Sequence, residues 1–116
     1  MLPGRGARPG VAAERRAARH YRLRGWTILG ANVWAGGNEL DLIARRGRSL
    51  RFVEVKEKGG PGWGDPLEMV TAEKQRRLRR AAEAWLAAHP QAAALEARFD
   101  VVAVRDGRLE CLRQAF

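Results

Sequence analysis

Two short segments place acidic and basic side chains where strand alternation would bring them together. Residues 38–44 read Asn-Glu-Leu-Asp-Leu-Ile-Ala, and residues 52–56 read Phe-Val-Glu-Val-Lys. In both segments apolar and polar side chains alternate, as in half-buried strands. The basic, glycine-containing stretch at residues 46–49 predicts a turn that joins them into a β-hairpin. We expect Arg45 to pair with Leu50 across this hairpin.

In this register two carboxylates face each other across the strands. Paired positions of an antiparallel ladder keep a constant sum, so Asp41 faces Glu54, with Cβ atoms roughly 4.5–5.5 Å apart. In the same way, Glu39 faces Lys56. Opposed carboxylates repel and raise each other's pKa, and a hard cation such as Mg²⁺ or Mn²⁺ would relieve that repulsion. A solvated strand face with an ordinary Glu39–Lys56 ion pair fits the same spacing.

The composition favours a polyanionic partner. The 116 residues carry a formal net charge of +9 and are 46% hydrophobic, as expected of one small folded α/β domain. Arginine supplies most of the excess, since lysine occurs only at Lys56, Lys58 and Lys74. Such a surface fits nucleic acid, with DNA as the first expectation and RNA as an open alternative. An arginine-rich solvated surface without a ligand is the other interpretation.

Several classes of function are disfavoured. Cys111 is the only cysteine, and His20 and His89 are far apart in sequence, so neither a disulfide framework nor a zinc site is expected. This cysteine usage favours a reducing, cytoplasmic compartment. No apolar stretch approaches the roughly 20 residues of a membrane span, and residues 1–10 lack the apolar core of a signal peptide.

The remaining chain supplies elements to hold the hairpin. After a flexible basic arm at residues 1–10, we expect a single domain over residues 11–116. A helix is predicted at residues 11–24, a strand at 26–34, a helix capped by Thr71 at about 71–89, and strands at 98–104 and 109–112. Leu40, Leu42, Val53 and Val55 would form the apolar underside of the hairpin. Residues 59–66, rich in glycine and proline, predict a loop in which Trp63 either packs on the domain or stacks on a base.

Both predicted helices carry arginines on their outer sides. Arg15 and Arg19 lie on the first helix, and Arg76, Arg77 and Arg80 lie on the second. Together they predict a stripe that contacts phosphates, although such runs are also common on solvated helix faces.

The succession of motifs resembles the PD-(D/E)xK nuclease superfamily, and within it the YraN-like group, uncharacterised protein family 0102, whose members are regarded as predicted endonucleases similar to Holliday junction resolvases. The resemblance spans residues 11–116. The matching positions are Glu14, Asn32, Glu39 and Asp41 in a G-E-x-D-L-I-A motif, residues 52–56, Gly64, Pro66, Glu68, Val70, Lys74, residues 98–102, Ala115 and Phe116. Departures occur at Asn38 (usually Gly), Trp34 (often basic) and Glu57 (usually small), and none removes a presumed catalytic group.

The resemblance implies an α/β fold with a restriction-endonuclease-like core, in which helices flank a mixed central sheet in the order αβββαββ. It also implies a metal-dependent endonuclease. Asp41 and Glu54 would hold Mg²⁺ or Mn²⁺, Lys56 would orient or help deprotonate the attacking water, and Glu14 would assist the metal.

Further expectations concern neighbouring groups and assembly. Glu39 would lie outside the metal's ligands, pairing with Lys56 or holding a metal-bound water. Lys74 would contact a phosphate, unless it is simply an exposed helix lysine. Superfamily members often dimerise, so a homodimer is compatible with the resemblance. A nucleic-acid-binding accessory protein that keeps this fold without cutting is the alternative function.

Overall fold

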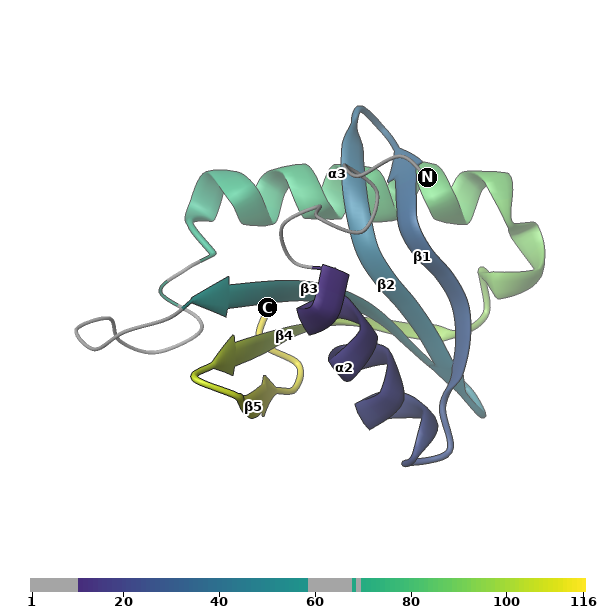
Figure 1. Ribbon diagram of the computed structural model, residues 1–116. Coiled ribbons are helices and arrows are strands. Elements are labelled where there is room, and N and C mark those ends of the chain that lie inside the picture. Colours follow the sequence, from purple (N-terminus) through teal and green to yellow (C-terminus); the bar gives the residue numbers. More distant parts are fainter. Residues whose placement is uncertain (1–10, 59–67, 69) are drawn as a thin grey trace, which may run out of the picture.

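The computed structural model describes residues 11–58, 68 and 70–116 (Figure 1). The predicted basic arm at residues 1–10 and the predicted loop at residues 59–66, including Trp63, lie outside the described residues. The elements are α2 (Val11–Arg22), β1 (Thr27–Ala35), β2 (Asn38–Arg46), β3 (Ser49–Lys58), α3 (Ala72–Ala88), the 3-10 helix η2 (Pro90–Ala92), β4 (Glu96–Arg105) and β5 (Arg108–Leu112). The predicted order of helices and strands is confirmed.

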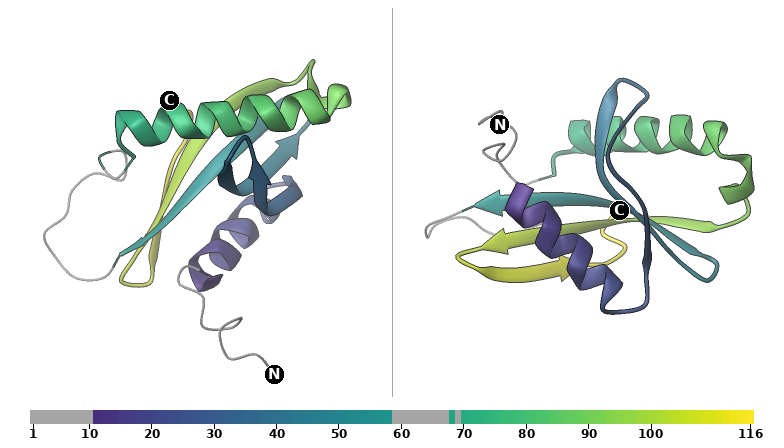
Figure 2. Two further views of the ribbon diagram at one scale, coloured as in Figure 1. Left: turned by 90° about the horizontal axis from the view of Figure 1, so that it is seen from above. Right: turned by 45° about the vertical axis from the view of Figure 1, so that its right-hand side comes forward.

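The strands form one mixed sheet in the order β1-β2-β3-β4-β5. β3 and β4 are parallel, and the other neighbouring pairs are antiparallel. α3 crosses over between the two parallel strands and covers one face, while α2 lies against the other face (Figure 2). The fold is therefore a mixed α/β architecture, as expected, in which α2 and α3 cover a central sheet.

Each face of the sheet has its own apolar layer. Under α3, Phe52 packs with Leu78 and Trp85. Under α2, Tyr21 and Trp26 pack with a smaller set that includes Leu42, Val53 and Val102. Burying a side chain of this size stabilises the fold by about 1.5–3 kcal/mol, so these two layers fix both helices on the sheet.

One expectation about the hairpin underside was wrong. Leu42, Val53 and Val55 share one face, the one under α2, as a common underside requires, but Leu40 belongs to the apolar layer under α3. Strict alternation would put Leu40 and Leu42 on the same face. The alternation fails at the intervening residue, Asp41, which is the first residue of β2 that no longer pairs with β3. The break in the ladder thus coincides with a predicted site residue.

A glycine allows the tip of the β1–β2 hairpin to rest on α3. Gly36 has a φ of +56°, and a Cβ placed there would lie 2.9 Å from the carbonyl oxygen of Arg80. Only glycine fits both the left-handed backbone and this close approach. The contact holds the tip of β1 and β2 against α3, away from the line of β3.

The start of α3 follows its sequence signal. Thr71 is the N-cap, and its Oγ1 accepts a hydrogen bond of 3.1 Å from the backbone N–H of Lys74. The cap satisfies one of the backbone donors left unpaired at a helix start. It also fixes Lys74 in the first turn of α3, where its side chain reaches the sheet.

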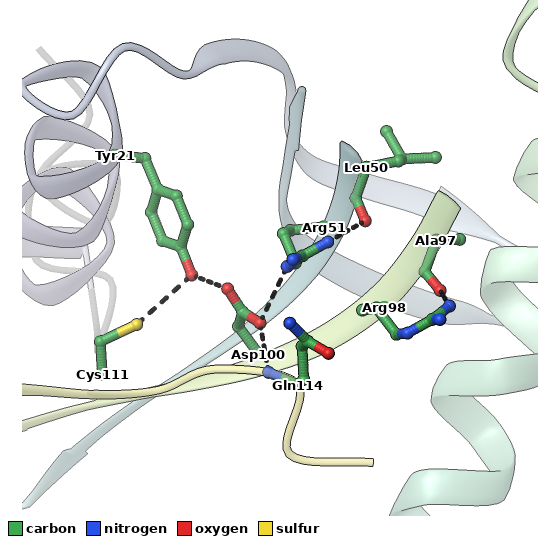
Figure 3. Close-up of polar contacts among 8 residues, drawn as sticks. All are labelled: Tyr21, Leu50, Arg51, Ala97, Arg98, Asp100, Cys111 and Gln114. Atoms are coloured by element: carbon green, nitrogen blue, oxygen red, sulfur yellow. Dashed lines mark hydrogen bonds and ion pairs between the residues drawn. The ribbon is translucent and has the colours of Figure 1, made fainter. Parts of the chain in front are cut away.

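A buried polar cluster ties α2 to the sheet (Figure 3). Its centre is Asp100 on β4, which accepts hydrogen bonds from the Tyr21 hydroxyl of α2 and, at 2.8 Å, from the backbone N–H of Gln114. The Nε of Arg51 lies 3.3 Å from Asp100 Oδ1, and the Cys111 Sγ lies 3.6 Å from the Tyr21 hydroxyl. Burial and the neighbouring Asp100 carboxylate raise the pKa of Tyr21, so its hydroxyl stays protonated and donates.

The exposed arginines do not form a single stripe. Arg15 and Arg19 lie on α2, whereas Arg76, Arg77 and Arg80 lie on α3, and all five are exposed. Because the two helices cover opposite faces of the sheet, the expectation of one continuous stripe was wrong. Among the described residues, no helix combines the length and apolar character needed to cross a membrane.

Candidate metal centre

The β2–β3 hairpin has the predicted register, and it ends where the candidate site begins. Arg45 pairs with Leu50, and the ladder continues to Leu42 and Val53. Beyond that pair β2 bends away with β1, and β3 continues alongside β4 (Figure 1). Because the strands separate here, backbone N–H groups of β3 can hydrogen-bond with side chains of β2.

Asp41 bridges this separation. Its Oδ2 accepts a hydrogen bond of 2.8 Å from the backbone N–H of Val55 on β3. The Glu54 carboxylate lies close enough to Asp41 to raise the pKa of the Asp41 carboxyl. The structure thus brings Asp41 and Glu54 together, as the register predicts, although the paired ladder stops one residue earlier.

Two lysines approach Glu54, which is almost completely buried. The Nζ of Lys56 lies 3.3 Å from Glu54 Oε2, and the Nζ of Lys74 lies 3.7 Å from the same oxygen. The contact with Lys74 depends on how α3 packs on the sheet and was not predicted from the sequence. These two ammonium groups offset much of the cost of burying the Glu54 charge.

Asp41 also belongs to a group of three carboxylates. Carboxylate oxygens of Glu14, Glu39 and Asp41 all lie within 4.8 Å of one another. Glu14 reaches the group from α2, as the resemblance implied. Glu39 was expected opposite Lys56, but its ladder partner is Trp34 of β1, because β2 has left β3 at this point. Glu39 is therefore as well placed to coordinate an ion as Glu14 is.

The accumulated negative charge acts on Asp41. Burial, followed by the neighbouring Glu54 carboxylate, raises the pKa of Asp41 from 3.8 to about 7, and Glu14 contributes in the same direction. The hydrogen bond from Val55 opposes this shift. Without a cation, Asp41 is thus partly protonated near neutral pH.

The side chains that converge here fit a hard divalent cation. Asp41 is common to both sets of contacts, since it neighbours Glu54 and also forms a group with Glu14 and Glu39. All four offer carboxylate oxygens, the ligand type that Mg²⁺ and Mn²⁺ prefer. A cation would also offset the repulsion that raises the pKa of Asp41.

Mn²⁺ affinity is expected to rise with pH between about 6 and about 8. Asp41 must lose its proton to coordinate, so below its pKa of about 7 each pH unit lowers the affinity by about tenfold. Isothermal titration calorimetry at several pH values measures the slope. An Asp41→Asn protein is the control, because its residual affinity should lack this dependence. A wild-type affinity independent of pH over this range would contradict the assignment.

The metal-free protein should show the opposite trend in stability. Between about pH 4 and about pH 7 the folded chain holds a proton on Asp41 that the unfolded chain has released. The stabilisation from this proton is present at low pH and is lost as the pH rises through the folded-state pKa. Urea unfolding in EDTA measures this trend against Asp41→Asn, from which it should be absent.

The remaining predicted residues lie outside the acidic site. Arg15, Arg19, Arg76 and Arg80 are exposed on the two helices, and Arg77 forms an ion pair of 2.8 Å with Glu73 on α3. An exposed pair of this kind adds little stability. These arginines remain available to a ligand that approaches either helix.

Comparison with known proteins places this chain in a family. A model described as uncharacterised protein family UPF0102 matches residues 13–104. A UPF0102 protein of Alkalilimnicola ehrlichii is 42% identical, with 92% of this chain and 85% of the relative covered. Another, from Symbiobacterium thermophilum, is 46% identical, with 90% of each chain covered. A UPF0102 protein of Methylocella silvestris is 44% identical, with 85% of this chain and 78% of the relative covered.

The match includes the segments that build the candidate site. Residues 13–104 contain most of α2, including Glu14, and all of β1 to β3 and of α3. The chain therefore belongs to uncharacterised protein family UPF0102.

Proposed function

We propose that this protein is a metal-dependent endonuclease that hydrolyses phosphodiester bonds of DNA. The supporting observation is the convergence of four carboxylates and two lysines where β2 separates from β3. Carboxylates suit a divalent cation, and lysines suit a phosphate or a water that must lose a proton. The net charge of +9 favours association with a polyanion.

Each group would have a distinct part in hydrolysis. A bound Mg²⁺ or Mn²⁺ would polarise the phosphate and lower the pKa of a coordinated water, which together lower the barrier by several kcal/mol. Asp41 and Glu54 would hold the ion, with Glu14 and Glu39 completing its surroundings. Lys56, 3.3 Å from Glu54, would orient the attacking water.

Lys74 would bind the phosphate. Its Nζ lies 3.7 Å from Glu54 Oε2 and comes from the first turn of α3. A lysine that pairs with Glu54 in the free protein can turn to a phosphate once a cation neutralises that carboxylate. The site would then exchange protein–protein ion pairs for contacts with the metal and the substrate.

The same ion pairs support a second candidate function. Lys56 and Lys74 pair with Glu54 without any metal, which is also what a purely structural ion-pair cluster requires. A protein of this kind would bind nucleic acid as an accessory factor and cut nothing. The two functions differ in whether the acidic centre acts on the bound strand.

Cleavage assays separate the two. Purified protein is incubated with supercoiled, single-stranded and four-way-junction DNA, and with RNA, in Mg²⁺, in Mn²⁺ and in EDTA. The nuclease proposal predicts cleavage of at least one DNA that requires the metal and stops in EDTA. Binding to DNA without cleavage in either metal would instead support the accessory function, and cleavage of RNA alone would change the substrate.

A further inference from the structure

A cavity of about 320 Å³ lies between α2 and the edge strand β1. Its apolar lining includes Ala18, Ala31 and Leu42, and Arg15 and Arg22 also line it. The two arginines are seven residues apart, which is about two helical turns, so they project from the same side of α2. The cavity therefore combines an apolar surface with two cationic groups.

This cavity adjoins the candidate metal centre. Glu14 lines the cavity and also belongs to the acidic group with Glu39 and Asp41. A molecule in the cavity would thus lie next to whatever occupies the centre. If a phosphodiester of a DNA strand lies at the metal centre, the next nucleotide of that strand is the group closest to the cavity and could enter it.

The size and the lining select one unpaired nucleotide. A volume of about 320 Å³ is at the lower end of the range for small-ligand sites, which is suited to a single nucleotide and too small for a base pair. The flat faces of a nucleobase are largely apolar and match the apolar lining of the cavity. The phosphates of the nucleotide match the guanidinium groups of Arg15 and Arg22, because a guanidinium can donate two parallel hydrogen bonds to one phosphate.

An exposed tryptophan extends this surface along the edge strand. The Trp34 side chain is 72% exposed, and its ladder partner is Glu39 of the acidic group. Directly paired residues share one side of the sheet, with Cβ atoms about 4.5–5.5 Å apart. Trp34 therefore offers a stacking surface beside the centre, of the kind that binds unpaired bases.

We propose that the cavity between α2 and β1 binds an unpaired nucleotide next to the cleaved bond, and that Trp34 stacks on a further base of the same strand. The inference rests on the proposed function for the identity of the strand at the centre. It identifies the substrate as DNA with an unpaired region, either single-stranded or branched. Continuous duplex would bind without using the cavity.

Binding measured without metal tests this proposal independently of cleavage. Fluorescence anisotropy in EDTA compares a labelled single-stranded oligonucleotide with a duplex of the same length. Arg15→Ala is expected to weaken single-strand binding about tenfold and duplex binding less. Arg16→Ala is the matched control, since it removes the same charge from the same helix. Arg16 lines a different cavity.

Two further variants probe the apolar surfaces. Ala31→Phe fills the cavity from the edge strand without changing any charge and should weaken single-strand binding, while Leu29→Phe on the same strand lies outside the cavity and should not. Trp34→Ala should lower single-strand affinity roughly fivefold or more, as expected for the loss of one stacked base. Circular dichroism confirms that each variant is folded.

The outcomes distinguish this inference from the proposed function. The cavity proposal would be overturned if Arg15→Ala and Arg16→Ala lost the same amount of single-strand affinity and Ala31→Phe bound the single strand as tightly as the wild type. Metal-dependent cleavage that persists in such a case would leave the nuclease function standing. Selective loss of single-strand binding in a protein that cuts nothing would instead support the cavity proposal and remove the nuclease.

Discussion

Replacing Glu54 with glutamine should lower metal-dependent DNA cleavage by about a thousandfold or more. The Glu54 carboxylate contacts Asp41, Lys56 and Lys74, so its charge influences both the cation and the two lysines. Losing a metal ligand removes several kcal/mol of barrier lowering, and each 1.36 kcal/mol is a tenfold change in rate. The measurement is single-turnover cleavage of the best substrate in Mn²⁺.

A matched variant controls for general effects of charge on β3. Glu57 lies three residues further along the same strand and is exposed, so Glu57→Gln removes the same charge outside the acidic centre. It should retain cleavage within a few-fold of the wild type. Equal cleavage by the wild type and Glu54→Gln would show that the activity comes from a contaminant or from another site.

Replacing Asp100 with alanine should lower the free energy of unfolding by about 3–5 kcal/mol. The change leaves the buried Arg51 guanidinium without its carboxylate and removes the acceptor for Tyr21 and for the N–H of Gln114. Breaking a buried ion pair by removing one partner is costly because the other charge stays buried. A domain of this size has only about 5–15 kcal/mol of stability, so the loss is a large fraction.

Urea unfolding followed by circular dichroism measures this loss. Glu110→Ala is the control, since it removes an ion pair of 3.7 Å with Arg105 whose glutamate side chain is half exposed, and it should cost at most about 1 kcal/mol. Similar values for the two variants would show that the Asp100 cluster does not hold α2 on the sheet. Because α2 carries Glu14, a folded Asp100 variant should also bind Mn²⁺ more weakly.

Local patterns predicted the parts of the site that depend on one hairpin. Strand alternation and a glycine turn sufficed to place Arg45 opposite Leu50 and to bring Asp41 and Glu54 together. Gly47, with a φ of +60°, supplies the left-handed residue that such a tight turn requires. The alternation of apolar and polar residues in a strand and the glycine of a turn each involve only a few neighbouring positions, so both can be recognised from the sequence alone.

Features that depend on the ends of the ladder were not predictable in this way. The position of Glu39 was extrapolated from the hairpin register, but β2 leaves β3 after Leu42 and pairs only with β1. Asn32 of β1 has a left-handed φ of +54° beside this break. Asparagine tolerates that conformation, but an asparagine in a strand is too weak a signal to locate a break.

Tertiary packing decided the remaining contacts. Lys74 reaches Glu54 because α3 crosses one face of the sheet, and Tyr21 meets Asp100 across 79 positions of sequence. The arginines of α2 and α3 are separated because the helices cover opposite faces. Local sequence patterns do not predict which face of the sheet a helix will cover, so these contacts could be identified only in the folded structure.

The most direct test of the central claim is a crystal structure of the protein with Mn²⁺, in which anomalous scattering locates the ion. We predict an anomalous peak at coordinating distance from an Asp41 carboxylate oxygen and from at least one carboxylate of Glu54, Glu14 or Glu39. The Nζ of Lys56 or Lys74 should then lie further from Glu54 than the 3.3 and 3.7 Å of the free protein. An ordered ion elsewhere, with none at Asp41 under saturating Mn²⁺, would contradict the assignment of this site as a metal centre.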